Sequence, residues 1–111
     1  MKNWEDYFAN LINRIGEFGK LAPGAVRGLN ALGNVPAKHL EPKVHELIAL
    51  SVAVTTRCDG CIAVHTQAAL KHGATREEIA EALSVAIALN AGAALTYSAR
   101  VFDAVAAFDK S

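Results

Sequence analysis

Apolar residues recur three and four positions apart near the start of the chain, which places them on one face of an α-helix. They are Trp4, Phe8, Leu11, Ile15 and Phe18. Asn3 precedes them and is a favourable N-cap residue. We predict an amphipathic first helix whose apolar face packs against another part of the protein, in the same chain or in a neighbouring subunit.

Glycines and prolines interrupt this pattern between residues 19 and 42. One short helix is expected to begin near Pro23, because proline is tolerated in a first helical turn, and a connecting loop should follow. Pro42 suits the start of a longer helix. Residues 44–54 of that helix are rich in leucine, isoleucine and valine, so we expect its second half to be buried nearly all round.

The next helix is predicted over residues 57–72. Thr56 suits its N-cap, and the acidic Asp59 would lie favourably in its first turn. Gly73 is well placed to end it, because glycine readily adopts the left-handed conformation. Both cysteines of the chain would then lie at the start of this helix.

A last helical stretch begins with a capping box from Thr75 to Glu78. Its apolar pattern weakens at residues 91–92 and resumes to about Phe108. Alanine, the best helix former, is the most frequent residue type in the chain. We therefore predict a single all-α domain over residues 1–111, with five or six helices and no strands.

Residues 82–99 carry no charged side chain and approach the length of a membrane span. Polar residues such as Asn90 interrupt the segment, and much of it is alanine, so a buried helix pair fits better than a membrane helix. The stretch is apolar on more than one face, whereas so small a domain has little core in which to bury two faces. The pattern predicts self-association and no membrane partner.

The charge balance argues against nucleic acid as a partner. Lys+Arg number 11 and Asp+Glu number 11, so no overall positive field attracts phosphate backbones. The first residues lack the apolar run of a signal peptide, which indicates a cytoplasmic protein. In that compartment a pair such as Cys58 and Cys61 is expected to be catalytic or metal-binding.

Cys58, Cys61 and His65 share a spacing that suggests chemistry. At about 100° per helical residue they fall within an arc of about 60°, and Cys61 can reach both of the others. The cysteines can close to a disulfide, and the positive end of the helix favours their thiolates. The helix dipole favours Cys58 as the reactive thiol, and contact with His65 favours Cys61, so the spacing leaves their order open.

Glu46 and His72 have two interpretations each. At the edge of its apolar run, Glu46 is either a partly buried proton carrier or an ordinary solvated glutamate. His72 could join His65 and the two cysteines in a zinc site, but structural zinc sites usually join two ligand pairs across a loop. We therefore expect no metal and no other cofactor.

These residues stand in an order that resembles a known family. Glu46 is followed, after eleven residues, by Cys-Asp-Gly-Cys at residues 58–61 and, after three more, by His65. The likeness continues through residues 71–79 into the apolar helix that follows. This pattern, over about residues 40–92, resembles the alkylhydroperoxidase D-like members of the carboxymuconolactone decarboxylase superfamily.

The resemblance implies an all-helical fold that assembles into trimers or hexamers. In such proteins Cys61 corresponds to the thiol that attacks the peroxide, Glu46 and His65 to a proton relay, and Cys58 to the resolving thiol. An external dithiol would then reduce the pair. The best-studied branch carries a second histidine where this chain has Gly60, so the relay implied here is shorter.

We therefore predict a thiol-dependent peroxidase or disulfide oxidoreductase that reduces hydroperoxides through its CxxC dithiol. One alternative is a lactone lyase of the decarboxylase type, although proteins resembling that branch generally lack the cysteine pair. Another is a non-enzymatic oligomeric module whose cysteines respond to redox state. Steady-state consumption of peroxide with a dithiol reductant separates the enzyme from the module.

Overall fold

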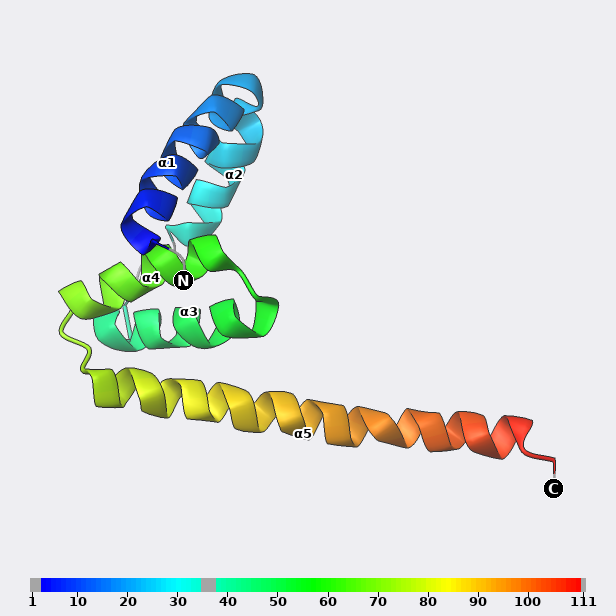
Figure 1. The fold of residues 1–111 in the computed structure, drawn as a ribbon. Helices are drawn as coiled ribbons and strands as arrows, with labels where there is room; N and C mark the ends of the chain where they lie inside the picture. The colour runs from blue at the N-terminus through cyan, green and yellow to red at the C-terminus, as the bar shows by residue number, and fades with distance from the viewer. Residues whose placement is uncertain (1–2, 35–37, 111) are drawn as a thin grey trace.

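The computed structural model describes residues 3–34 and 38–110, and within these ranges the chain forms five α-helices and no strand (Figure 1). The helices are α1 (Trp4–Leu21), α2 (Pro23–Gly33), α3 (Pro42–Thr56), α4 (Asp59–Lys71) and α5 (Arg76–Phe108). The predicted all-α fold is confirmed. Part of the expected connecting loop, residues 35–37, lies outside the described residues.

Short local signals set most of the helix ends. The Asn3 side chain accepts a hydrogen bond from the backbone N–H of Asp6 at 3.0 Å and so caps α1. Gly73 has a φ of 86°, the left-handed conformation that ends the turn after α4. Thr75 and Glu78 form the predicted capping box, with hydrogen bonds of 2.9 and 3.0 Å. Prolines stand in the first turns of α2 and α3.

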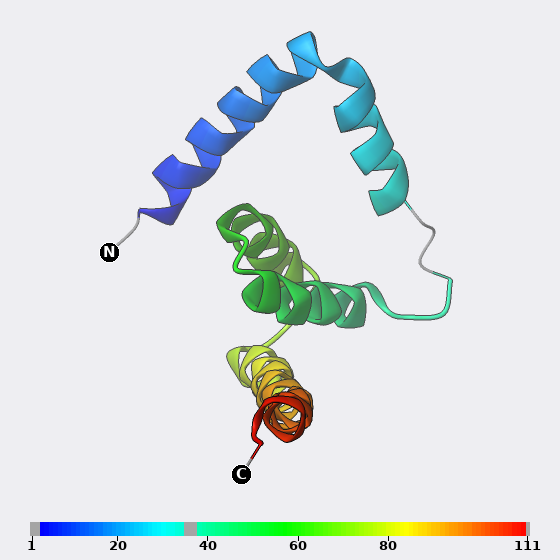
Figure 2. The same ribbon diagram turned by 90° about the vertical axis from the view of Figure 1, so that its right-hand side faces the viewer.

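The helices pack in a row rather than around one centre (Figure 2). Among the described residues, α1 packs on α2 and on α4, α4 packs on α3, and α3 packs on α5. Helices α3 and α4 form a hairpin at the middle of this row, and the first half of α5 lies on the far side of α3 (Figure 1). A site built on α3 and α4 is therefore flanked by helices on both sides.

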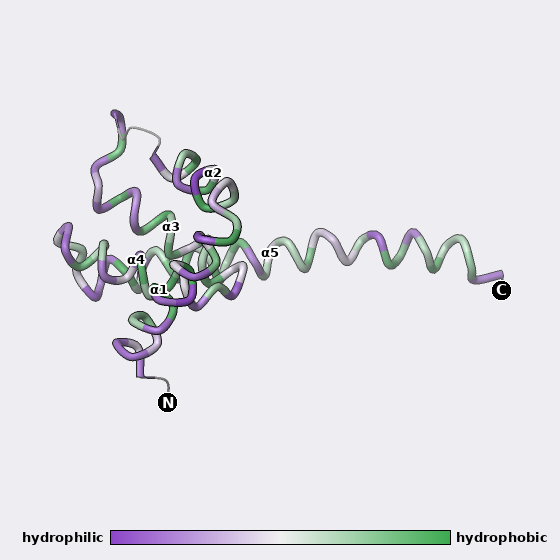
Figure 3. Tube along the Cα trace, turned by 90° about the horizontal axis from the view of Figure 1, so that it is seen from above, coloured by the Kyte–Doolittle hydropathy of each residue, from purple (hydrophilic) through white to green (hydrophobic). Residues whose placement is uncertain are grey.

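The core of the single chain is small. Leu50, Ala69 and Ala74 form a buried cluster, against which Leu47 and Ile79 pack. The Cα atoms have a radius of gyration of 18.9 Å, against about 13 Å for a compact domain of this length. The second half of α5 explains much of this excess, since it runs away from the other helices with apolar positions along its length (Figure 3).

Two expectations about burial are wrong for the single chain. In the second half of α3 only Leu50 and Ala53 are buried, and Val52 is 56% exposed. Residues 82–99 belong to one continuous helix instead of a buried helix pair, and Ala86 is the buried residue of α5. A glycine such as Gly92 weakens a helix by only about 1 kcal/mol, too little to break so long a run of helix formers. By length and composition α5 could also cross a membrane.

Candidate active site

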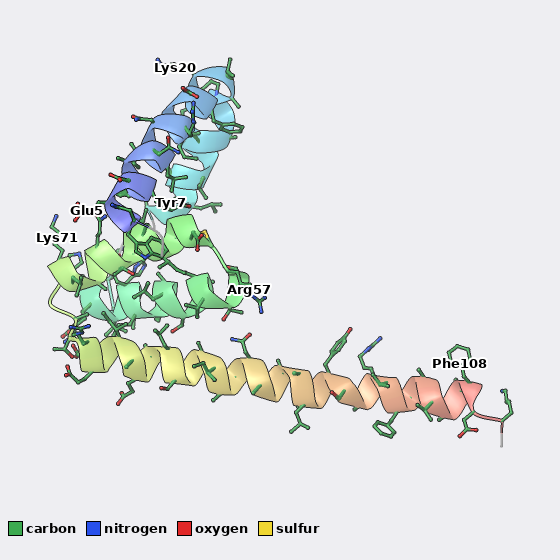
Figure 4. All side chains as sticks on the ribbon, in the orientation of Figure 1. Glu5, Tyr7, Lys20, Arg57, Lys71 and Phe108 are labelled. Carbon is green, nitrogen blue, oxygen red and sulfur yellow. A yellow bond between two sulfur atoms is a disulfide. The ribbon has the colours of Figure 1, made fainter. Side chains whose placement is uncertain are left out.

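The two cysteines lie at the turn between α3 and α4. Arg57 ends α3 in the left-handed conformation, with φ 55° and ψ 50°. Cys58 is then extended and forms the N-cap of α4, where its Sγ accepts the backbone N–H of Cys61 at 3.1 Å. Cys58 and Cys61 are joined in a disulfide, with Cα atoms 5.2 Å apart. Figure 4 shows the bonded sulfurs at the same corner of the molecule as Arg57.

This geometry corrects the predicted start of the helix. Thr56 still belongs to α3, where its hydroxyl donates to the carbonyl of Val52 at 3.1 Å, so it cannot cap the next helix. The left-handed Arg57 turns the chain, and α4 begins at Asp59. Cys58 therefore lies outside the helical arc that we predicted for it, and of the three residues Cys61 and His65 share the helix.

The position of Cys58 affects its chemistry once the disulfide is reduced. Backbone N–H groups in a first helical turn have no partner within the helix, and the helix dipole places partial positive charge there. A thiolate on Cys58 would accept the N–H of Cys61 that its sulfur already faces. Both effects stabilise the thiolate relative to the thiol. Cys58 and Cys61 are both half-buried, within reach of small molecules from solvent.

Glu46 and His65 form a close polar contact between α3 and α4. Oε2 of Glu46 lies 2.6 Å from Nδ1 of His65. The Glu46 side chain is 14% exposed and that of His65 34%. His45 approaches the other carboxylate oxygen at 3.9 Å and is half exposed. Glu46 is therefore a mostly buried carboxylate in contact with His65 and not an ordinary solvated glutamate.

The four predicted site residues are thus joined in two pairs. One pair is the disulfide, and the other is the contact between Glu46 and His65. Cys61 and His65 connect the pairs because they stand four residues apart on α4. That spacing brings Cβ atoms to about 6 Å of each other on one face of a helix.

The sequence did not indicate the contact that α1 makes with the cysteine turn. A Cβ built on Gly60 would stand 3.0 Å from Cδ2 of Leu11 and 3.8 Å from the hydroxyl of Tyr7. Figure 4 shows Tyr7 where α1 meets α4. Leu11 belongs to the predicted apolar stripe of α1, but the stripe does not show which helix it meets. Gly60 thus provides the space that lets α1 approach the turn.

A pocket of about 470 Å³ opens beside this contact. At about 100° per residue, the α4 side chains that line it project from a different side of the helix than Cys61 and His65. One side of α4 therefore carries Cys61 and His65 and faces α3. Another side packs against α1. The pocket is lined by Trp4, Glu5, Ile62, Ala63, Thr66 and Gln67.

The four residues that could bind zinc do not form the single cluster that a zinc site requires. Within residues 3–34 and 38–110, no three His, Cys, Asp or Glu side chains come close enough together to hold a metal ion. His72 is the C-cap of α4, at the opposite end of that helix from Cys58. The cysteine sulfurs bind each other.

Known proteins share both the sequence and the fold. The sequence pattern of the Carboxymuconolactone decarboxylase family matches residues 23–104. An uncharacterized protein of Haemophilus influenzae is 47% identical over 104 residues, which cover 92% of each chain. The uncharacterized protein H16_B0147 of Cupriavidus necator is 37% identical over 106 residues, covering 88% of this chain and 87% of that protein.

One solved structure extends the likeness to the whole fold. Apo-lpg0406, a carboxymuconolactone decarboxylase family protein of Legionella pneumophila, superposes with a TM-score of 0.73 at 32% identity. The superposition covers 99% of this chain and 100% of the other. The chain therefore belongs to the carboxymuconolactone decarboxylase family.

Proposed function

We propose that this protein is a thiol-dependent peroxidase of the alkylhydroperoxidase D type, which reduces hydroperoxides through Cys58 and Cys61. The observation that carries the proposal is the 2.6 Å contact between Glu46 and His65 on the helix hairpin that also holds the cysteines. A bonded cysteine pair alone would serve a redox sensor equally well. A carboxylate and an imidazole beside it supply the proton transfers that turnover requires.

The contact between Glu46 and His65 favours the His65 tautomer that this role needs. An ionised carboxylate can only accept hydrogen bonds, so Nδ1 of a neutral His65 carries the proton and donates it toward Glu46. Nε2 of His65 then keeps its lone pair and acts as the base. The carboxylate also stabilises the imidazolium that forms when His65 takes a proton. Glu46 is thus a positioning residue, and His65 is the general base.

The first half of the reaction oxidises Cys61. His65 removes the Cys61 proton, and the thiolate attacks the terminal oxygen of the hydroperoxide. The O–O bond breaks, an S–O bond forms, and the leaving alkoxide takes the proton back from His65 as an alcohol, or as water when the substrate is hydrogen peroxide. Cys61 is left as a sulfenic acid.

The second half restores the dithiol. Cys58 attacks the sulfur of the Cys61 sulfenic acid, the disulfide forms, and water leaves with the Cys58 proton. An external dithiol then reduces the disulfide by two exchange steps and is itself oxidised to a disulfide. The N-cap position favours the Cys58 thiolate, which helps both its attack and its departure during exchange.

We further propose that the enzyme is a cytoplasmic homo-oligomer, a trimer or a hexamer. The exposed apolar residues of α5 and the small core of the single chain support self-association. The partners of the reaction would be the hydroperoxide and the dithiol, with no nucleic acid and no membrane involved. The balanced charge of the chain agrees with the lack of a nucleic acid partner.

Steady-state peroxide consumption tests the function directly. Purified protein is mixed with dithiothreitol and either hydrogen peroxide or cumene hydroperoxide, with dithiothreitol alone as the blank. We expect turnover by the wild type and none by Cys61→Ser. In a separate reaction without dithiothreitol, Cys58→Ser should stop at a sulfenic acid that reacts once with dimedone. Multiple turnovers at the wild-type rate by either variant would contradict the assigned roles.

The same variants separate the lyase and the redox module from the peroxidase. A decarboxylase-type lyase would use Glu46 and His65 without the thiols, so a variant with both cysteines changed to serine would keep its activity. A module would form its disulfide once with peroxide and would not cycle under excess dithiol. A wild-type rate no faster than that of a free thiol would also count against the peroxidase.

A further inference from the structure

Helix α5 carries one stripe of residues along its whole length, and its own chain covers only the first half. Within the body of the molecule the stripe packs against α3 and the core, through positions that include Ile79, Ala86 and Asn90. The same spacing of three and four continues beyond them. We call residues 93–108 the arm; its part of the stripe consists of Ala93, Tyr97, Val101, Ala104 and Phe108.

The stripe of the arm carries no charged side chain, and α1 to α4 of its own chain do not cover it. The guanidinium of the neighbouring Arg100 lies 5.2 Å from the centre of the Tyr97 ring. Tyr97 is 69% exposed, Val101 61% and Phe108 82%. The arm extends about 24 Å along the helix axis, and Figure 4 shows Phe108 at its far end, away from α1 to α4. Leu95 and Phe102, 75% and 73% exposed, lie on the opposite side of the arm. The Tyr97 side is the one that continues the packed stripe, and a stripe of this length needs a surface along all of it.

The surface area of the chain points to a large protein partner. The accessible surface is 8862 Å², whereas a compact folded chain of this mass exposes about 5,900 Å². The excess of about 3,000 Å² exceeds the roughly 800 Å² that each partner buries in a standard interface. Obligate interfaces bury about 1,000–2,500 Å² or more of each partner through apolar surfaces, so one or two such interfaces account for an excess of this size.

The groove between α3 and α5 has the properties of a surface that a partner can cover. It has a volume of about 340 Å³ and no charged residue in its lining. Its polar side chains already bond within the chain: Ser51 donates to the Ala82 carbonyl at 3.3 Å, and Asn90 to the Thr55 hydroxyl at 2.9 Å. Polar groups with internal partners can be covered without leaving a hydrogen bond unmade. The groove is lined by Ser51, Val52, Thr55, Val85, Ala86, Leu89 and Asn90.

We propose that the arm of one copy of the chain lies on the groove between α3 and α5 of a second copy. Neither the arm stripe nor the groove carries a charged side chain, and the arm continues the stripe that packs against α3 in its own chain. Exchange of arms around a closed ring, or between two copies, leaves no arm uncovered. The proposal rests on the self-association proposed above and not on the peroxidase chemistry.

Charge placed on the arm tests the contact. The variant with Tyr97→Glu and Val101→Glu is compared with Ala99→Glu, which adds a charge about 160° around the same helix. Sedimentation velocity at micromolar concentration should show an oligomer for the wild type and Ala99→Glu, and a monomer for the double variant. Far-UV circular dichroism of all three proteins establishes that α5 is still helical. Equal dissociation by Ala99→Glu would overturn the assigned face.

A mixing experiment identifies the groove as the site that the arm occupies. Leu89→Lys in the groove and Val101→Glu on the arm should each weaken the oligomer, and mixing the two variants should restore it through a new ion pair. No recovery on mixing would overturn the contact between arm and groove. A monomeric wild type that floats with phosphatidylcholine and phosphatidylglycerol vesicles would show a membrane as the occupant and overturn the proposal. Peroxide turnover, measured in parallel, tests the enzymatic function separately.

Discussion

Leu11 of α1 lies against Gly60 so closely that a Cβ on the glycine would stand 3.0 Å from the Leu11 Cδ2. Gly60 is the residue between Asp59 and Cys61 in the first turn of α4. The contact joins the hairpin of α1 and α2 to the turn that carries the disulfide. A Cβ at this position would require the end of the Leu11 side chain to shift, and a larger side chain would also meet the Tyr7 hydroxyl.

The first prediction concerns this contact. Gly60→His should lower the free energy of unfolding by about 1–3 kcal/mol through overpacking, and it should speed hydrogen exchange of the amides in α1. Gly28→His is the control, because nothing lies within 4 Å of a Cβ built on Gly28. Adding Leu11→Ala to Gly60→His should slow the exchange again, and unchanged exchange in the single variant would contradict the contact.

The second prediction concerns the carboxylate beside His65. Glu46→Gln keeps the size of the side chain but removes the charge that stabilises the imidazolium, so sulfenic acid formation on Cys61 should slow by at least about tenfold. Glu46→Asp should recover part of the rate, because it restores the charge. Glu81→Gln, on the exposed surface of α5, should react as the wild type does.

A double-mutant cycle tests whether Glu46 affects the reaction rate through His65. If Glu46 acts through His65, the loss caused by Glu46→Gln should nearly vanish in a His65→Gln background. Single-turnover labelling with dimedone measures each rate. Fully additive losses would show that Glu46 and His65 act independently.

The third prediction concerns Cys58 as an N-cap. In excess reductant no disulfide contributes, and the side chain at this position acts only through its hydrogen bond to the N–H of Cys61. Cys58→Ser keeps an acceptor, whereas Cys58→Ala removes it, so the alanine variant should be less stable by about 1 kcal/mol. Urea unfolding at one protein concentration measures the difference. Equal stability of the two variants would mean that the cap does not hold α4.

The fourth prediction concerns the ion pair that joins the start of α3 to the start of α5. Nζ of Lys43 lies 2.8 Å from Oε2 of Glu78. The hydrogen bond from Lys43 lowers the pKa of Glu78, and the Thr75 backbone N–H adds to this effect. The Glu78 carboxylate in turn raises the pKa of Lys43. The pair therefore stabilises the fold at neutral pH, and this contribution is lost as acid protonates Glu78.

The measurement is the melting temperature of Lys43→Gln at several pH values. The variant should melt below the wild type at pH 7, and the gap should close as the pH falls below the ordinary carboxyl value of 4.5 toward the lowered pKa of Glu78. Lys110→Gln, outside α5, is the control for loss of a positive charge. A gap that persists in strong acid would show that Lys43 acts through packing instead.

Local signals in the sequence determined most of the secondary structure. Asn3, Pro23, Gly73 and the capping box at Thr75 act within a few residues of themselves, so each helix end that depends on them was predictable. The turn before α4 was not, because Thr56 is a favourable N-cap residue by type, whereas in the structure α3 continues through Thr56 and Cys58 caps α4. Arg57 adopts the left-handed conformation between the two helices, which residue type alone does not predict.

The order and spacing of Glu46, Cys58, Cys61 and His65 pointed to the family, but not to the distances among them. Glu46 and His65 are nineteen positions apart, and a contact over that separation exists only once the hairpin has closed. The meeting of Leu11 with Gly60 likewise depends on where α1 docks. By itself, the sequence determined the helices and the candidate chemistry, since these follow from local propensity and residue type. The tertiary structure alone decided which helix faces meet and which stay exposed, because the burial of a side chain depends on all the segments that pack around it.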